Sequence, residues 1–118
     1  MLLLKLQRTC VFSYLAAIAL QVYMMGLALF GVTSVMPHAM WGYLMILGSL
    51  LLVVLTLTAK LPRRALLLSV AVLGLTILQP VLVLTLRGSA PAIAALHPLN
   101  ALAIFVLAVG VARSTAAR

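Results

Sequence analysis

The sequence predicts an all-α membrane protein: an antiparallel, up-down-up-down bundle of four transmembrane helices that forms a single domain over residues 1–118. Of the 118 residues, 67% are hydrophobic and 7% are charged, which is too few charges to cover the exterior of a soluble domain. Four apolar runs each approach the ~20 residues that a helix needs to cross a bilayer. The connections between these runs are short, so neighbouring helices must run antiparallel.

The four helices are expected at about residues 9–32, 37–59, 65–86 and 91–112. The segments between them, GVTSVMPH, AKLPRR and LRGSAP, contain the glycine, proline and serine residues that are typical of turns. Backbone groups cannot stay unpaired in lipid, so each run should be helical and packed against the others. Within the fourth run, Pro98 is expected to kink the helix or to begin its tight part.

All side-chain charge in the sequence is positive, because it contains eight Lys and Arg residues and no Asp or Glu. Only Arg87 falls on the outer side of the predicted helices. The other basic residues all fall on the opposite side: Lys5, Arg8, Lys60, Arg63, Arg64, Arg113 and Arg118. This asymmetry predicts cytoplasmic termini and a multi-pass protein of a bacterial inner (plasma) membrane. Topology therefore explains the charge, and the expected partner is membrane lipid, with no nucleic acid.

The missing carboxylates exclude several functions. Small multidrug exporters of similar length depend on a membrane-embedded glutamate, so proton-coupled export of that type is not expected. Most hydrolytic chemistry also lacks a general base here, apart from the histidines. Cys10 is the single cysteine, so neither an internal disulfide nor covalent attachment of haem is expected. We therefore expect an electron carrier or a subunit rather than an enzyme.

The two histidines of the chain, His38 and His97, each lie near the outer end of a helix that descends from the outer face. A weak repeat underlies them, because Gln21 precedes His38 by 17 residues and Gln79 precedes His97 by 18. Two such hairpins, packed about an axis along the membrane normal, would turn the imidazoles toward each other. A facing pair of imidazoles can ligate iron, so we predict bis-histidine binding of haem b, as in a cytochrome b-like electron carrier.

Three further residues belong to the predicted haem site. Arg87, in the outer loop region, is expected to pair with the haem propionates. Each ligand ring needs an acceptor for its second nitrogen, which must be a backbone carbonyl, a hydroxyl or Asn100. Gly42 allows close helix approach, and a flat macrocycle between the helices needs such small neighbours too.

Simpler interpretations of the same residues stay open. His38 and His97 also fit two interfacial polar residues that face lipid headgroups. Gln21 and Gln79 fit interhelical hydrogen bonds, worth about 0.6 to 2 kcal/mol each, as well as the edge of a haem or quinone pocket. Trp41 fits an aromatic belt at the outer interface.

The layout resembles one half of the haem A synthase family, on His38 with Gly42 and Gly48 after it, and on His97 in LHPLNA. Those enzymes have two four-helix halves, each holding haem between histidines at the outer ends of its second and fourth helices. The half that oxidises substrate has a glutamate about one turn before its first histidine, and the stretch SVMPH has none. The resemblance therefore implies the cofactor-holding half, with electron transfer or haem retention rather than haem hydroxylation. The chain also resembles small, uncharacterised actinobacterial four-helix membrane proteins, which implies no activity.

The competing function is a small, non-catalytic accessory subunit of a larger respiratory or photosynthetic membrane complex. The size of the chain and its lack of a soluble domain suit that role. Beyond lipid, the expected partners are a redox partner, the larger complex or further copies of the chain.

Overall fold

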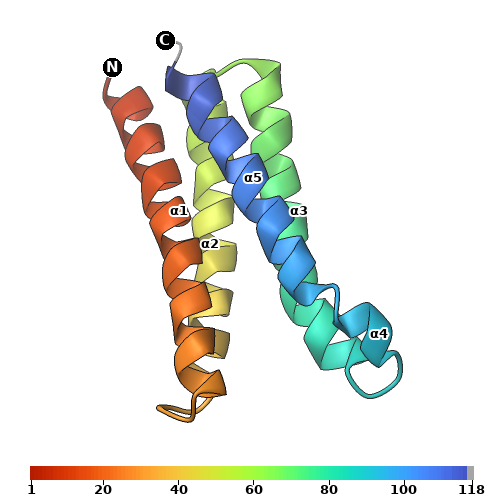
Figure 1. Cartoon of the computed structure of the whole chain (residues 1–118). Helices are drawn as coiled ribbons and strands as arrows, with labels where there is room; N and C mark the ends of the chain where they lie inside the picture. The colour runs from red at the N-terminus through yellow and green to blue at the C-terminus, as the bar shows by residue number, and fades with distance from the viewer. Residues whose placement is uncertain (117–118) are drawn as a thin grey trace.

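The computed structural model describes residues 1–116, which are helical apart from short turns and contain no strand. Figure 1 shows that successive long helices run in opposite directions. Within these residues there are four spans long and apolar enough to cross a membrane. They are formed by α1 (Leu2–Leu29), α2 (Met36–Thr58), α3 (Arg63–Leu86), and the pair α4 (Pro91–Ala94) and α5 (His97–Ala116). The predicted all-helical fold is confirmed, and the four long apolar spans suit a multi-pass membrane protein.

The two ends of the bundle differ in what they contain. One end, the terminal end, holds the beginning of α1, the α2–α3 turn and the end of α5; the other, the histidine end, holds the α1–α2 turn and α4 (Figure 1). The molecule is 45 Å long and 28 by 18 Å across. That length matches the roughly 40–45 Å of a bilayer with its headgroups, and many large apolar side chains are exposed on the outside, as a lipid-facing surface requires.

The core is built from inward positions that repeat with alternating steps of four and three residues. Such a seven-residue repeat keeps one face of each helix directed at its neighbours. The buried residues on this repeat are Gln7, Val11, Tyr14 and Ile18 in α1; Met45, Ser49, Leu52 and Thr56 in α2; Ala65, Ser69, Val72 and Thr76 in α3; and Ile104, Ala108, Val111 and Thr115 in α5.

The same repeat places the predicted site residues on the inward faces. Continued toward the histidine end, the steps of three and four reach Gln21 in α1, His38 in α2, Gln79 in α3 and His97 in α5. The packing of the core therefore directs these four residues toward the middle of the bundle.

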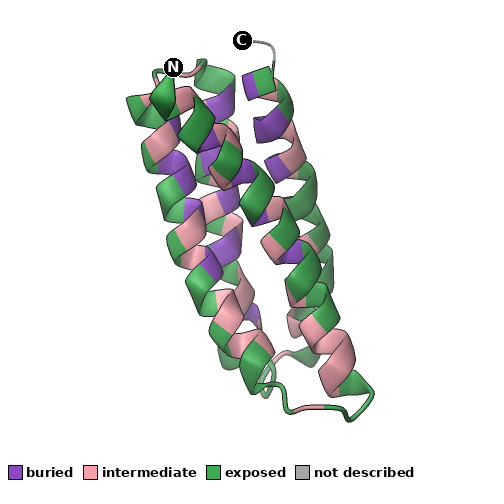
Figure 2. Cartoon of the chain, turned by 90° about the vertical axis from the view of Figure 1, so that its left-hand side faces the viewer, coloured by how far each residue is buried: buried purple, intermediate pink, exposed green. Residues whose placement is uncertain are grey.

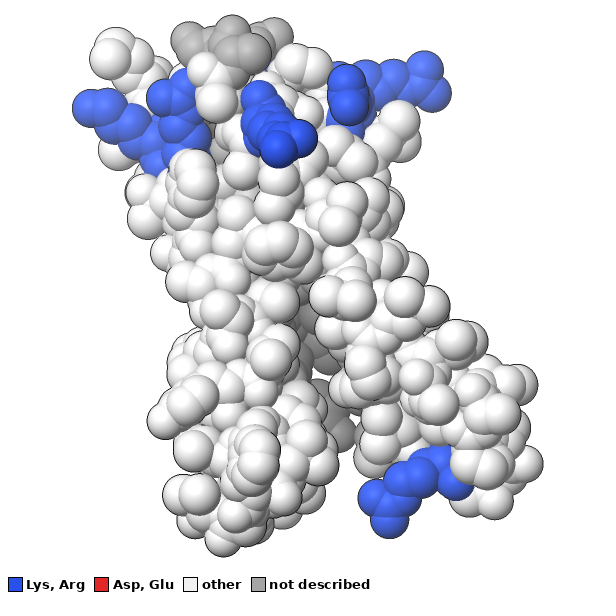
Figure 3. Space-filling view, in the orientation of Figure 1, with Lys and Arg blue, Asp and Glu red and all other residues white. Residues whose placement is uncertain are grey.

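The bundle is closed at the terminal end and open at the histidine end. Apart from Leu82, every buried residue lies within 7–18, 45–56, 65–76 or 104–115. Figure 2 shows the buried positions gathered toward the terminal end. The α1–α2 and α3–α5 hairpins diverge toward the histidine end in Figure 1, and Figure 3 shows the surface hollowed between them. Inward side chains beyond the closed core are consequently only half-buried.

Two turns end their helices in the same way, by a Schellman motif. At the end of α1 the left-handed residue is Gly31, with a φ of 72°, and at the end of α2 it is Lys60, with a φ of 51°. The N–H after each one donates back five residues, at 2.9 Å in the first turn and 3.2 Å in the second. Glycine adopts this conformation freely, whereas another residue such as lysine pays roughly 1–2 kcal/mol.

Two predicted boundaries differ from the structure. The first helix begins at Leu2 rather than at about residue 9, so Lys5 and Arg8 lie within α1 instead of preceding it. Leucine, lysine, glutamine and arginine fill that stretch, and all are good helix formers. The fourth predicted helix is divided into α4 and α5. The expected effect of Pro98 is confirmed there, because proline lacks an N–H and is tolerated only near the start of a helix.

The fully buried polar side chains of the closed core are paired, except that of Gln7. The hydroxyls of Tyr14 and Thr76 are 2.6 Å apart, and those of Thr56 and Ser69 are 3.1 Å apart. Gln7 is fully buried, yet neither atom of its amide has a partner among the described residues. A buried amide without partners lowers stability.

Replacing Gln7 with methionine, which has a similar volume and no strong hydrogen-bonding group, should therefore stabilise the bundle. An unpaired buried polar group costs about 1–3 kcal/mol, so the Tm of the purified protein in detergent should rise. Gln21→Met is the matched control and should lower the Tm, because Gln21 Nε2 donates to the carbonyl of His38 at 3.0 Å. A lower Tm for Gln7→Met would show that this amide has a partner, contrary to our account.

Candidate functional site

His38 and His97 come together between the two hairpins at the histidine end. His38 lies in the first turn of α2, and His97 begins α5. Their ring centroids are 6.2 Å apart and the ring planes are inclined at 64°. Both residues are half-buried. The structure thus brings the two imidazoles together, inclined edge to face, where the repeated Gln–His spacing predicts that they meet.

Each imidazole is held by a backbone carbonyl of the preceding helix in its own hairpin. His38 Nδ1 is 3.1 Å from the Gln21 oxygen, and His97 Nδ1 is 3.1 Å from the Gln79 oxygen. A carbonyl can only accept, so each Nδ1 carries the hydrogen, and in the neutral ring Nε2 then has the lone pair. Both rings are therefore fixed in the tautomer that binds a metal through Nε2.

In the first hairpin the contact is reciprocal. While Gln21 accepts from the His38 ring, the Gln21 side chain donates from Nε2 to the His38 carbonyl at 3.0 Å. Gly42, one turn after His38, makes room for this amide, since a Cβ there would lie 3.1 Å from Gln21 Nε2. The predicted role of Gly42 in close helix approach is confirmed.

In the second hairpin, the side chain of Asn100 makes the hydrogen bonds that join the two helices. Its Nδ2 donates to the Leu75 carbonyl at 2.8 Å and to Gln79 Oε1 at 2.9 Å. Among the three acceptors considered for the imidazoles, the backbone carbonyl is the one used, and Asn100 instead ties α5 to α3 beside His97. The side chains of Gln21 and Gln79 both make interhelical hydrogen bonds, which was one of their two interpretations.

Trp41 has a role that the sequence did not predict. Its indole Nε1 donates to the Ala17 carbonyl at 3.2 Å, and Ala17 lies near the middle of α1. Trp41 therefore uses its polar atom inside the hairpin rather than at a membrane interface. This bond fastens α2 to α1 one turn from His38.

The site lies where the hairpins diverge, which leaves space beside it. Gln21, Gln79 and Asn100 are only half-buried, although they lie on the inward side of the bundle. Gln21 Oε1 is shielded from solvent and has no partner among the described residues. These half-exposed inward groups belong to the histidine end, where Figure 3 shows the surface hollowed between the hairpins.

Basic side chains are distributed unequally between the two ends. Figure 3 shows them gathered at the terminal end, with one at the histidine end. That one is Arg87, which is exposed and caps the end of α3. Arg118, which the sequence grouped with the basic residues of the opposite end, lies outside the described residues.

The described residues contain no group of three or more His, Cys, Asp or Glu that could hold a metal ion. Metal ions bound by protein alone usually have at least three protein ligands. Haem iron receives its equatorial nitrogens from the macrocycle, so two axial histidines complete its coordination. The donor set of His38 and His97 therefore fits haem better than a bare metal ion.

Replacing Asn100 with leucine should destabilise the protein by about 1–2 kcal/mol, because two interhelical hydrogen bonds in a membrane bundle are lost. Reversible unfolding in detergent measures this difference. Ser114→Ala is the control, because the Ser114 hydroxyl bonds only to the Gly110 carbonyl of its own helix, and its effect should stay within about 0.5 kcal/mol. Equal stability of the two variants would contradict a stabilising role for the Asn100 hydrogen bonds.

The chain belongs to a family described as a family of unknown function (DUF6220), whose model matches residues 21–86. The match includes His38 and ends before His97. No curated protein and no solved structure matches the chain. Family membership brings no activity with it, and the resemblance to haem A synthase halves stays a prediction.

Proposed function

We propose that this chain binds one b-type haem at the histidine end, through His38 and His97, and serves in electron transfer or haem handling. The observation that carries the proposal is the facing pair of imidazoles, each fixed through Nδ1 so that Nε2 is available. His38 and His97 would hold the haem iron through two imidazole nitrogens, and ligation by two histidines favours electron transfer over oxygen binding.

The separation of the rings supports a shared metal. Bonds of about 2 Å from metal to nitrogen, with about 1 Å from each nitrogen to its ring centre, place two ring centres roughly 6 Å apart. The observed distance is 6.2 Å. A direct edge-to-face contact between rings has a similar distance. A simple ring–ring contact, however, does not require both rings to have the same tautomer, and it does not require space between the hairpins. These two features favour ligation of a shared metal over a simple ring–ring contact.

Each residue at the histidine end has a definite part in this proposal. Bound haem would supply a one-electron Fe(III)/Fe(II) couple. The carbonyls of Gln21 and Gln79 orient the rings and increase the basicity of Nε2, as acceptors behind ligating histidines do. Arg87, the one cation at this end among the described residues, would pair with the propionates.

The charge distribution supports an orientation for the site. Among the described basic residues, Arg87 alone lies at the histidine end. Basic residues are retained on the cytoplasmic side of membrane proteins. We therefore propose a bacterial plasma-membrane protein with its terminal end in the cytoplasm and the haem near the outer face.

Absorption spectra of the purified protein test the proposal. With haem supplied, the dithionite-reduced wild type should show the sharp visible bands of low-spin, bis-imidazole haem. His38→Ala and His97→Ala should each lose this low-spin spectrum, because one axial position is then empty. Gln21→Ala is the control and should keep the ligation, since the His38 ring bonds to the backbone of residue 21 and not to its side chain.

Two results would contradict the proposal. One is the absence of a Soret band after haem has been supplied to folded wild type. The other is an unchanged low-spin spectrum in the double variant His38→Ala, His97→Ala. A haem-free chain that co-purifies with a larger complex would instead support the accessory-subunit function.

A further inference from the structure

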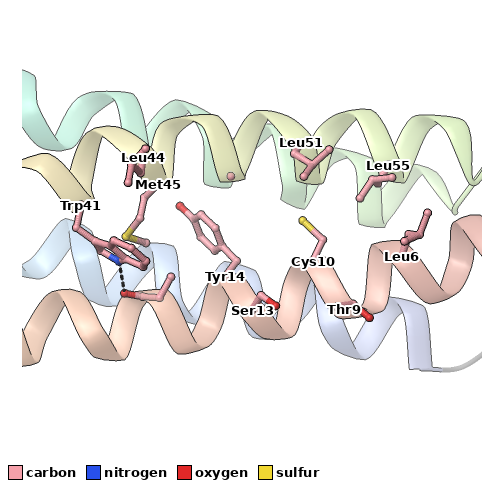
Figure 4. Close-up of a pocket in the computed structure, with 12 residues that line it drawn as sticks. Leu6, Thr9, Cys10, Ser13, Tyr14, Trp41, Leu44, Met45, Leu51 and Leu55 are labelled. Atoms are coloured by element: carbon pink, nitrogen blue, oxygen red, sulfur yellow. Dashed lines mark hydrogen bonds between the residues drawn. The ribbon is translucent and has the colours of Figure 1, made fainter.

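An apolar groove of about 570 Å³ runs along the outside of the α1–α2 hairpin. Figure 4 shows its lining, which comes from residues 6–17 of α1 and 41–55 of α2. Small residues such as Ser13 and Gly48 form the floor of the hollow, and larger apolar side chains line its edges. The groove is separate from the histidine site, which lies farther along the hairpin.

The groove has the dimensions of one leaflet. From Leu6 to Ala17 the helix rises by about 1.5 Å per residue, or roughly 16 Å in all, which is about half of the ~30 Å hydrocarbon core of a bilayer. On α1 it begins near the terminal end and stops at Ala17, close to the middle of that helix, and on α2 its lining extends to Trp41, in the second turn. A hydrocarbon chain in the groove would lie along the helices, as an acyl chain lies in a membrane.

The deep end of the groove offers no free polar group to a ligand. The Trp41 N–H is already donated to the Ala17 carbonyl, and the Tyr14 hydroxyl is 2.6 Å from the hydroxyl of Thr76. A molecule with its polar head at this end, such as a quinone, would find no hydrogen-bond partner among these groups. A polar head therefore fits better on the terminal side of Tyr14, where the hydroxyls of Ser13 and Thr9 belong to the lining.

Two lysines lie at the terminal ends of the two helices that line the groove. Lys5 lies one turn before Thr9, a residue of the lining, and Lys60 follows the end of α2. Both are exposed, and no Asp or Glu exists in the chain to pair with them. Lys60 also occupies a left-handed conformation, with a φ of 51°, that a glycine would adopt more readily.

We propose that this groove binds one acyl chain of an anionic phospholipid from the leaflet at the terminal end, with the phosphate beside Lys5 and Lys60. The apolar lining accommodates the chain, and the unpaired lysines select the negative headgroup. Each cation near the headgroups should contribute about fivefold to the preference for an anionic lipid. The proposal rests on the groove and the lysines alone and does not require haem.

The fluorescence of Trp41 provides the test, because it is the only tryptophan of the chain and closes the deep end of the groove. The full chain is reconstituted in bilayers of phosphatidylcholine in which a fraction of the lipid carries bromine near the methyl end of its acyl chains. Bromine quenches tryptophan on contact. Brominated phosphatidylglycerol should quench Trp41 at a lower mole fraction than brominated phosphatidylcholine, and Lys5→Gln or Lys60→Gln should each lower that preference about fivefold.

Matched variants separate the groove from general surface charge. Arg113→Gln removes an equal charge from the terminal end on α5, which does not line the groove, so it should keep the preference. Ser13→Leu fills the groove without changing charge and should weaken quenching by both lipids. Equal quenching by the two lipids, or equal losses in Lys5→Gln and Arg113→Gln, would overturn the proposal. If quenching falls as the protein-to-lipid ratio is raised, a second copy of the chain occupies the groove instead of lipid. That result would overturn the proposal as well.

Discussion

A histidine ring between membrane helices has two nitrogens, and the neutral ring carries one N–H that must find an acceptor inside the protein. In this chain the acceptor cannot be a carboxylate side chain, because the sequence has none. The backbone oxygens of Gln21 and Gln79 accept instead, each at 3.1 Å from a histidine Nδ1. These two bonds set the tautomer of the neutral rings, fix both rings and leave the two Nε2 atoms without a hydrogen. The candidate site, and the function proposed for it, depend on that constraint.

The closed end of the bundle holds this arrangement in place. Paired hydroxyls of Tyr14 with Thr76 and of Thr56 with Ser69 link α1 to α3 and α2 to α3 within the core. Interhelical hydrogen bonds and close packing, rather than the exclusion of water, drive helix association in lipid. Because these contacts are concentrated at the terminal end, the hairpins are free to diverge at the histidine end. A site with room between the hairpins follows from where the core is placed.

The sequence predicted the parts of the fold that depend on hydropathy and proline: four spans, short turns and the break at Pro98. It also predicted that His38 and His97 would meet, because the Gln–His spacing repeats in both hairpins. The inward faces were harder to find, since these helices are apolar on all sides and hydrophobic periodicity is weak when a helix faces lipid. The signal that marks the inward faces is instead the series of small and polar residues at steps of four and three.

Specific partners within the site could not be predicted for a related reason. Asn100 was considered as an acceptor for a histidine, but its amide donates to the Leu75 carbonyl and to Gln79. The choice depends on helix rotation and on backbone oxygens, which no residue type reveals. The Trp41 bond to Ala17 and the groove beside it depend in the same way on the close approach of α1 and α2. An aromatic residue near a helix end gave no indication of either.

Low-temperature electron paramagnetic resonance of the ferric protein, reconstituted with haem, tests most directly whether these two imidazoles bind one iron. Ring planes inclined at 64° predict the strongly anisotropic low-spin signal of two axial imidazoles that are far from parallel. A high-spin signal would contradict ligation by both histidines, and the rhombic low-spin signal of parallel imidazoles would contradict the geometry from which the account is built.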